Sequence, residues 1–200
     1  MATAAPATEP RLLKAEELMK LPDDAHAELL DGVLVVMSPA GGDHGSVTVR
    51  LLSALAVWVH ERELGEVFDS STGFILGRDP DILRAPDAAF VAAARLPARR
   101  RGFLEVAPDL AVEILSPSNT VVEMSRKLRD YFRAGVRLVW VIDPQTRSVA
   151  VHAADGPIQA WLEEGATLDG GEVLPGFAVP LARIFAGLSR DEDAAPAAGA

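Results

Sequence analysis

Two acidic residues, Asp87 and Glu113, lie within or directly beside apolar segments that are expected to be buried. Glu113 is the only charged residue in the apolar run 110–115, and Asp87 stands at the start of the preceding apolar segment. Burying an unpaired charge is costly. If the two segments form an antiparallel pair of strands, Asp87 and Glu113 lie together at one end of a sheet. Adjacent carboxylates repel each other unless a cation lies between them, and oxygen ligands of this kind suit Mg²⁺ or Mn²⁺.

A lysine on the next element can reach the same place. Thr120 and Glu123 have the spacing of a capping box, which predicts a helix from Thr120 to Ala134. Lys127 lies about 10 Å into this helix, and Glu113 lies about 10 Å back along its strand. The two residues should therefore be level once the chain has reversed. An ammonium group at this point can orient a metal-bound water or stabilise developing negative charge.

Four further residues are candidates for the same site, each with a plainer alternative. Glu28 is either another acid near the metal or an ordinary charge of a hairpin. His44 either contacts phosphate or simply belongs to the first turn of a helix. Glu123 is better explained as the capping partner of Thr120, and Tyr131 is better explained as a core residue.

The charge of the chain is unevenly distributed. The formal net charge is −10, which by itself argues against a nucleic-acid partner. Residues 84–137 nevertheless carry ten basic and six acidic side chains, a local charge of +4. This segment is either a solvated loop and helix face or a phosphate-binding patch. The predicted nucleic-acid contacts are Arg95, Arg99, Arg100, Arg101, Arg126, Arg129 and Arg133.

Several other kinds of chemistry are excluded or disfavoured. The absence of cysteine excludes disulfides, thiolate metal sites and a cysteine nucleophile. The pair Gly41-Gly42 lacks the Lys-Ser/Thr of a phosphate-binding loop, and no Gly-x-Ser-x-Gly elbow occurs. The four histidines do not have the spacing of metal ligands. A glycosidase acid pair would leave Lys127 and the arginines without a role.

The elements that must position these residues alternate between helix and strand. Asp31-Gly32 between apolar runs predicts a hairpin, and Asp43 or Ser46 is expected to cap a helix ending near Glu63. Shorter helices are expected over 15–21 and 181–188. Strands are expected near 66–68, 73–76, 88–91, 110–115, 138–142, 149–152 and 158–162, the last two forming a C-terminal β-meander. This order predicts an α/β (α+β) fold with a mixed central sheet flanked by helices.

The length of 200 residues suits one domain, expected over 11–189. The Ala/Pro-rich or acidic ends, 1–10 and 190–200, are expected to be disordered tails. The start of the chain lacks the features of a signal peptide, and the apolar stretch 51–59 is too short to cross a bilayer. We therefore expect a cytoplasmic protein with no membrane partner.

Several strings of the chain occur together in one order. They are Pro86-Asp87, the segment 108–118, Lys127 with Tyr131, Gly135-Val136, the segment 139–144 and the segment 174–177. This ordered set resembles the Uma-type restriction-endonuclease family of the PD-(D/E)XK nuclease superfamily. Residues 28–32 and His44 resemble the N-terminal half of the family, so that the resemblance extends over 24–188.

The resemblance implies a restriction-endonuclease-like fold and Mg²⁺-dependent hydrolysis of DNA phosphodiester bonds. Asp87 and Glu113 would be the metal ligands and Lys127 the catalytic lysine. The superfamily usually has its lysine two residues after the strand acid, where this chain has Leu115. The Uma-type pattern has it on the following helix, which Lys127 matches. A second departure is Ala27, where the family usually has an aromatic residue.

Three functions follow as alternatives. The first is a metal-dependent endonuclease acting on DNA, for which a homodimer would supply one site for each strand. The second is a catalytically inactive protein that binds nucleic acid through the same fold. The third is a small-molecule hydrolase that uses the carboxylate pair. The joint presence of Asp87, Glu113 and Lys127 favours the first.

Overall fold

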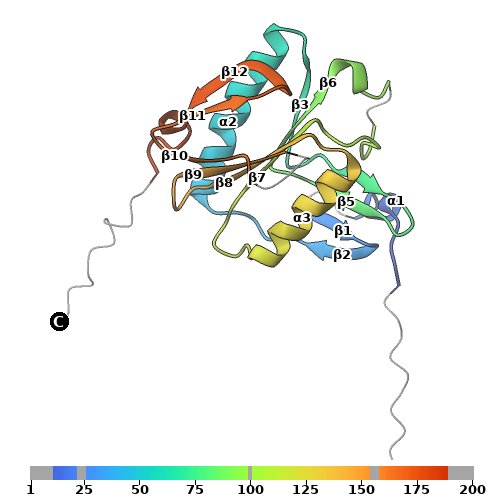
Figure 1. Ribbon diagram of the computed structural model, residues 1–200. Helices are drawn as coiled ribbons and strands as arrows, with labels where there is room; N and C mark the ends of the chain where they lie inside the picture. The colour runs from blue at the N-terminus through green and yellow to red at the C-terminus, as the bar shows by residue number, and fades with distance from the viewer. Residues whose placement is uncertain (1–10, 22–25, 99–100, 154–157, 189–200) are drawn as a thin grey trace, which may run out of the picture.

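A mixed six-stranded sheet forms the centre of the molecule (Figure 1). The computed structural model describes residues 11–21, 26–98, 101–153 and 158–188. In spatial order, the strands of this sheet are β10 (Ala160–Glu163), β9 (Ser148–Ala153), β8 (Leu138–Asp143), β7 (Leu110–Ile114), β6 (Ala88–Ala92) and β3 (Gly65–Asp69). Strands β7 and β8 are parallel, and the other neighbours are antiparallel. The predicted antiparallel pair β6–β7 is confirmed, and β8, β9 and β10 form a meander that extends the central sheet.

The central strand β7 separates two apolar layers. Its five residues are all buried. Leu110 and Val112 belong to the larger core, whereas Ala111 packs in the smaller core on the opposite face. Because side chains alternate along a strand, Glu113 shares the face of Ala111. The apolar sequence of β7 is therefore that of a strand covered on both sides.

Two long helices cover these faces (Figure 1). Helix α2 (Gly42–Glu61) buries an apolar stripe against the larger core. The stripe consists of Val47, Leu51, Leu55 and Val59. The predicted cap at Asp43 or Ser46 is wrong, because the helix begins at Gly42 and its N-cap is Gly41, with no side-chain cap. Asp43 lies instead in the first turn, where a negative charge suits the helix dipole.

Helix α3 (Val121–Ala134) connects the parallel strands β7 and β8. The predicted capping box is confirmed, since Thr120 and Glu123 each bond the other's backbone N–H. The helix ends at Gly135, which takes a left-handed φ of 93° that glycine adopts without steric cost. These two ends fix which residues of α3 face the sheet.

A second, smaller sheet lies beside α3 (Figure 1). Its strands, in spatial order, are β2 (Val33–Val36), β1 (Ala27–Leu30), β5 (Ile82–Arg84) and β4 (Phe74–Gly77). The predicted hairpin is confirmed, because Asp31 and Gly32 join β1 to β2 with positive φ angles of 50° and 77°. Strand β5 was not expected, since three residues are too few for a recognisable alternation. It carries the buried residues Leu83 and Arg84.

The remaining elements are short. Strands β11 (Thr167–Gly170) and β12 (Leu174–Pro180) form a hairpin that packs in the larger core, and the 3₁₀ turn η1 (Ala93–Arg95) follows β6. Helices α1 (Ala15–Leu18) and α4 (Leu181–Ile184) are both shorter than expected. Helix α4 ends early because the chain leaves helical geometry at Phe185, and Gly187 follows at a φ of 70°.

The predicted tails, 1–10 and 190–200, lie outside the described residues. Within the described ranges, none of the helices combines the length and the apolar character that crossing a membrane requires.

Candidate active site

Asp87 and Glu113 lie together at one end of the central sheet. Ala88 faces Val112 across β6 and β7, so the register places Asp87 opposite Glu113. Oδ2 of Asp87 accepts a hydrogen bond of 2.7 Å from the backbone N–H of Ile114. The predicted meeting of the two acids is therefore confirmed as geometry.

Lys127 reaches Glu113 from α3. Its Nζ lies 2.7 Å from Oε2 of Glu113, so the predicted level of the two residues is confirmed. The hydroxyl of Tyr131, one helical turn further on, donates to the other oxygen of the same carboxylate. Tyr131 is fully buried and Lys127 nearly so, with 13% of its side chain exposed. Tyr131 is thus a core residue, as its plainer alternative predicts. It also contacts the cluster of polar side chains formed by Asp87, Glu113 and Lys127.

Glu28 brings the smaller sheet into the cluster. It lies on β1, is 2% exposed, and its Oε1 is 3.4 Å from Nζ of Lys127. Its Oε2 accepts a 2.7 Å hydrogen bond from Nη1 of Arg84, and its Oε1 accepts one of 3.1 Å from the N–H of Ala85. Arg84 in turn binds Asp130 of α3, through Nε at 3.1 Å and through Nη2.

Sequence reasoning missed Arg84 and Asp130. Both are buried, although each is charged. A signal for Asp130 is present in the sequence, because it stands three residues after Lys127 and directly before Tyr131, and so shares their helix face. Arg84 gives a weaker signal, since it follows an apolar pair in a strand too short to recognise. The burial of these two charged side chains is explained by their pairing with each other.

His44 contacts the cluster from the first turn of α2. Its Nε2 lies 3.2 Å from Oδ2 of Asp87. The hydrogen bond to Asp87 raises the pKa of His44, against the opposing effect of burial. Both side chains are mostly buried, with 16% and 17% exposed. His44 thus lies in the first turn of α2, as one interpretation predicts, and also beside the acids, while its contact with phosphate stays a prediction.

The carboxylate of Glu113 is held in an unfavourable environment. Burial raises the pKa of Glu113 to about 6, and the negative charges of Asp87 and Glu28 add to the effect, while Lys127 opposes it. Burial lowers the pKa of Lys127, but the attraction of Glu113 and Glu28 outweighs it and the net shift is upward. Burial and the nearby Glu113 also raise the pKa of the Tyr131 hydroxyl. Lys127 is therefore a cation and Tyr131 a neutral donor near neutral pH.

The fold and the family of the chain are both matched among known proteins. A crystal structure of a "putative nuclease belonging to DUF820" from Anabaena variabilis superposes with a TM-score of 0.76 over 88% of this chain and 98% of that one, at 20% identity. The model of the Uma2 family, described as "Putative restriction endonuclease", matches residues 15–182. The chain belongs to the Uma2 family. No curated protein matches it.

The acids of this Uma2 protein suit a hard divalent cation. Mg²⁺ commonly binds one or two carboxylates and completes its coordination with water and substrate phosphates. Asp87 and Glu113 offer such a pair, whereas the described residues contain no group of three or more His, Asp or Glu side chains able to hold a metal by themselves. The donor set therefore fits Mg²⁺ or Mn²⁺ bound together with a substrate, and Glu113 would share its charge between the cation and Lys127.

Glu123 lies outside the cluster of Asp87, Glu113 and Lys127. It is exposed, and Oε2 accepts hydrogen bonds of 2.9 Å from the N–H and the hydroxyl of Thr120. These hydrogen bonds lower the pKa of Glu123. Its role is that of a helix cap, as its alternative predicts.

The predicted nucleic-acid contacts fall into three groups. Arg95 binds Asp109 at 2.7 Å, and Arg126 binds Asp31 at 2.6 Å, so both are engaged within the protein. Arg101, Arg129 and Arg133 are exposed, as is the paired Arg95. Arg99 and Arg100 lie outside the described residues.

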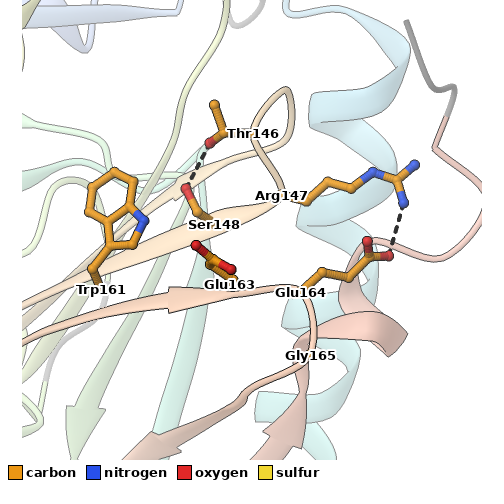
Figure 2. Close-up of a pocket in the computed structure, with 7 residues that line it drawn as sticks. All are labelled: Thr146, Arg147, Ser148, Trp161, Glu163, Glu164 and Gly165. Atoms are coloured by element: carbon orange, nitrogen blue, oxygen red, sulfur yellow. Dashed lines mark hydrogen bonds and ion pairs between the residues drawn. The ribbon is translucent and has the colours of Figure 1, made fainter. Parts of the chain in front are cut away.

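A surface pocket lies away from this cluster, at the β9–β10 side of the sheet (Figure 2). It has a volume of about 330 Å³, and its lining includes Trp161, Ser148 and Arg147. Nη1 of Arg147 is paired with Glu164 at 2.9 Å, as Figure 2 shows. Glu163 adds a second carboxylate to this pocket, and none of the residues proposed for chemistry lines it.

Proposed function

We propose that this protein is a metal-dependent endonuclease that hydrolyses DNA phosphodiester bonds at the cluster of Asp87, Glu113 and Lys127. The observation that carries the proposal is the convergence of these three side chains at one end of the sheet, with Nζ of Lys127 2.7 Å from Glu113. The Uma2 family supports the same class of reaction.

The proposed metal ligands are Asp87 and Glu113. A bound Mg²⁺ or Mn²⁺ would neutralise phosphate charge and lower the pKa of a coordinated water. Two side chains and one backbone N–H hold the two acids in place. Tyr131 and Lys127 each occupy one oxygen of Glu113, and the N–H of Ile114 fixes Oδ2 of Asp87.

Lys127 is the residue proposed to assist the nucleophile. An ammonium group has three N–H donors. The close contact with Glu113 uses one of them, and Glu28, at 3.4 Å, is a looser partner. A donor therefore remains for a water molecule or a phosphate oxygen, where its charge stabilises the negative charge that develops during hydrolysis.

The exposed arginines of α3, Arg129 and Arg133, are proposed to contact phosphates, together with Arg101. Because the whole protein is acidic, with a net charge of −10, non-specific affinity for DNA should be weak and should fall steeply with salt. A homodimer, with one site for each strand, remains a further expectation.

The test is nicking of supercoiled plasmid DNA by the purified full chain, in Mg²⁺ or Mn²⁺ and in excess EDTA. We expect nicking that EDTA abolishes, and a loss of roughly a hundredfold or more in Asp87→Asn and Glu113→Gln. Glu123→Gln is the matched control, since it neutralises an exposed carboxylate outside the cluster and should keep the wild-type rate.

Two results would overturn the proposal. Full activity in Asp87→Asn and Glu113→Gln would separate the cluster from the chemistry. Salt-dependent DNA binding by the wild type without cleavage in either metal would favour the inactive nucleic-acid-binding protein. Calorimetric titration of Mn²⁺ into the wild type and Asp87→Asn gives a readout of metal binding that does not depend on activity.

A further inference from the structure

A buried arginine links the two sheets behind the proposed site. Arg84 is 2% exposed and lies between two carboxylates, Glu28 on β1 and Asp130 on α3. Each carboxylate comes from a different element, and both are buried. A planar guanidinium holds its N–H donors in a rigid fork and so binds two carboxylates in fixed directions, whereas the N–H donors of a lysine rotate.

The contacts of Glu28 show what this arrangement holds. Oε2 of Glu28 accepts from Arg84, while Oε1 accepts from the N–H of Ala85 and faces Nζ of Lys127. Glu28 therefore contacts Lys127 and also the backbone two residues before Asp87. Fixing this one carboxylate fixes the surroundings of two residues proposed for the chemistry.

The helix face of α3 completes the connection. Lys127, Asp130 and Tyr131 stand at i, i+3 and i+4, so they point the same way. Lys127 and Tyr131 bind Glu113 of the central sheet, whereas Asp130 binds Arg84 of the smaller sheet. The position of α3 between the sheets thus depends on polar contacts to both of them.

We infer that Arg84 and Asp130 are positioning residues of the proposed nuclease site: with Glu28 they fix the place of the Lys127 ammonium group. This inference rests on the proposed function for its kinetic test. Neither residue touches the acids Asp87 and Glu113 in the hydrogen bonds of the described residues, so both act through Glu28 and Lys127.

The test is the variant Asp130→Asn, which keeps the shape of the side chain and removes its charge. The guanidinium of Arg84 then has one carboxylate, Glu28, and turns toward it, which draws Oε1 of Glu28 away from Lys127. We expect kcat for plasmid nicking to fall roughly tenfold while KM for DNA stays unchanged. In a Lys127→Met background, Asp130→Asn should have no further effect, because the two changes act through one group.

A crystal structure of the variant gives a readout that does not need activity. The distance from Nζ of Lys127 to Oε1 of Glu28 should rise from 3.4 Å to beyond the ion-pair limit of about 4 Å. Arg84→Lys is the second variant, should Asp130→Asn fail to fold. It keeps the buried positive charge but lacks the fork, and we expect the same fall in kcat.

The matched control is Glu164→Gln, which breaks the 2.9 Å pair with Arg147 at the surface pocket and should leave kcat unchanged. Unchanged kcat and an unchanged Lys127–Glu28 distance in Asp130→Asn would overturn the inference. A wild type that cleaves no DNA would instead overturn the proposed function, while the crystal structure would still decide whether Asp130 positions Lys127.

Discussion

Two clusters of charged residues in this protein are built around a buried carboxylate, and they treat it in opposite ways. Asp81 is fully buried, and its oxygens accept from the N–H of Ala15 at 2.9 Å, from Arg78 at 2.8 Å and from Lys14 at 3.3 Å. Glu113 is also buried, but two other acids, Asp87 and Glu28, lie near it. Two cations and a backbone N–H reach Asp81, whereas Glu113 has one cation, Lys127, and lies beside two further negative charges.

The pKa values follow this difference. Burial raises the pKa of Asp81, but the N–H of Ala15, Arg78 and Lys14 together outweigh it and the net shift is downward. Burial raises the pKa of Glu113 to about 6, and Lys127 does not compensate for it. Asp81 therefore stabilises the fold as a carboxylate, whereas Glu113 is kept charged at a cost. A perturbed carboxylate of the second kind is typical of a functional site.

The largest expected effect is a difference in kcat between variants of the two central cations, Lys127 and Arg78. Lys127→Met should lower kcat for plasmid nicking by roughly 10²–10³-fold, because it removes the charge proposed to stabilise the reacting phosphate. Arg78→Met removes the cation that pairs with Asp81, Glu16 and Glu105, and should leave kcat unchanged. Equal losses in the two variants would mean that the difference between the clusters has no bearing on the chemistry.

The next effect concerns stability. Asp81→Ala should destabilise the protein by about 2–3 kcal/mol, because the N–H of Ala15 is left buried without an acceptor and two hydrogen bonds to charged donors are lost. Urea denaturation at pH 7 measures the change in the free energy of unfolding. The rate of nicking per folded molecule should stay at the wild-type value, and a change of less than 0.5 kcal/mol, roughly the effect of an ordinary surface substitution, would contradict the structural role of Asp81.

The pH dependence of stability should have opposite signs in the two clusters. The pKa of Glu113 is about 6 in the folded state and about 4.5 when unfolded, so wild type should lose about 2 kcal/mol relative to Glu113→Gln as the pH rises from well below 4.5 to well above 6. The pKa of Asp81 is lowered, so the advantage of wild type over Asp81→Asn should be lost as the pH falls below the ordinary range of an aspartate. Urea titrations in EDTA across this pH range measure both. Parallel curves for the two variants would remove the distinction.

The smallest effect tests the support of Glu113. Tyr131→Phe keeps the buried ring and removes the hydroxyl that donates to Oε1 of Glu113. We expect a loss of about 1.5 kcal/mol in the free energy of unfolding, since one hydrogen bond to a charged group disappears. The pKa of Glu113 should rise further, which NMR titration of its side-chain carboxyl carbon measures. A pKa that falls or stays constant would show that the hydroxyl does not stabilise the charged form.

Much of this arrangement could be predicted from the sequence, because it depends on local patterns. The apolar run around Glu113 predicted a central strand, and the capping box of Thr120 and Glu123 fixed the start of α3. Helix rise and strand rise then brought Lys127 level with Glu113, as the 2.7 Å contact confirms. In each case the geometry follows from one element or from two neighbours in the chain.

The contacts between distant segments could not be predicted in this way. Arg84 and Glu28 are 56 positions apart, and Arg84 and Asp130 are 46 apart. No periodicity relates such residues, and the three-residue strand β5 gives too little pattern to place Arg84. The prediction of where α2 begins was wrong for a different reason. Gly41 takes an extended conformation at the N-cap and has no side chain that could mark the start of the helix.

The helix that joins the parallel strands β7 and β8 also limits how this chain can change in length. An α-helix turns by about 100° for each residue, so one residue inserted near the start of α3 would turn the shared face of Lys127, Asp130 and Tyr131 away from the sheets that it contacts. The exposed segment 117–120 before the helix faces no such restriction. Natural insertions and deletions in relatives of this protein should therefore fall before Val121 or after Gly135, and not between them.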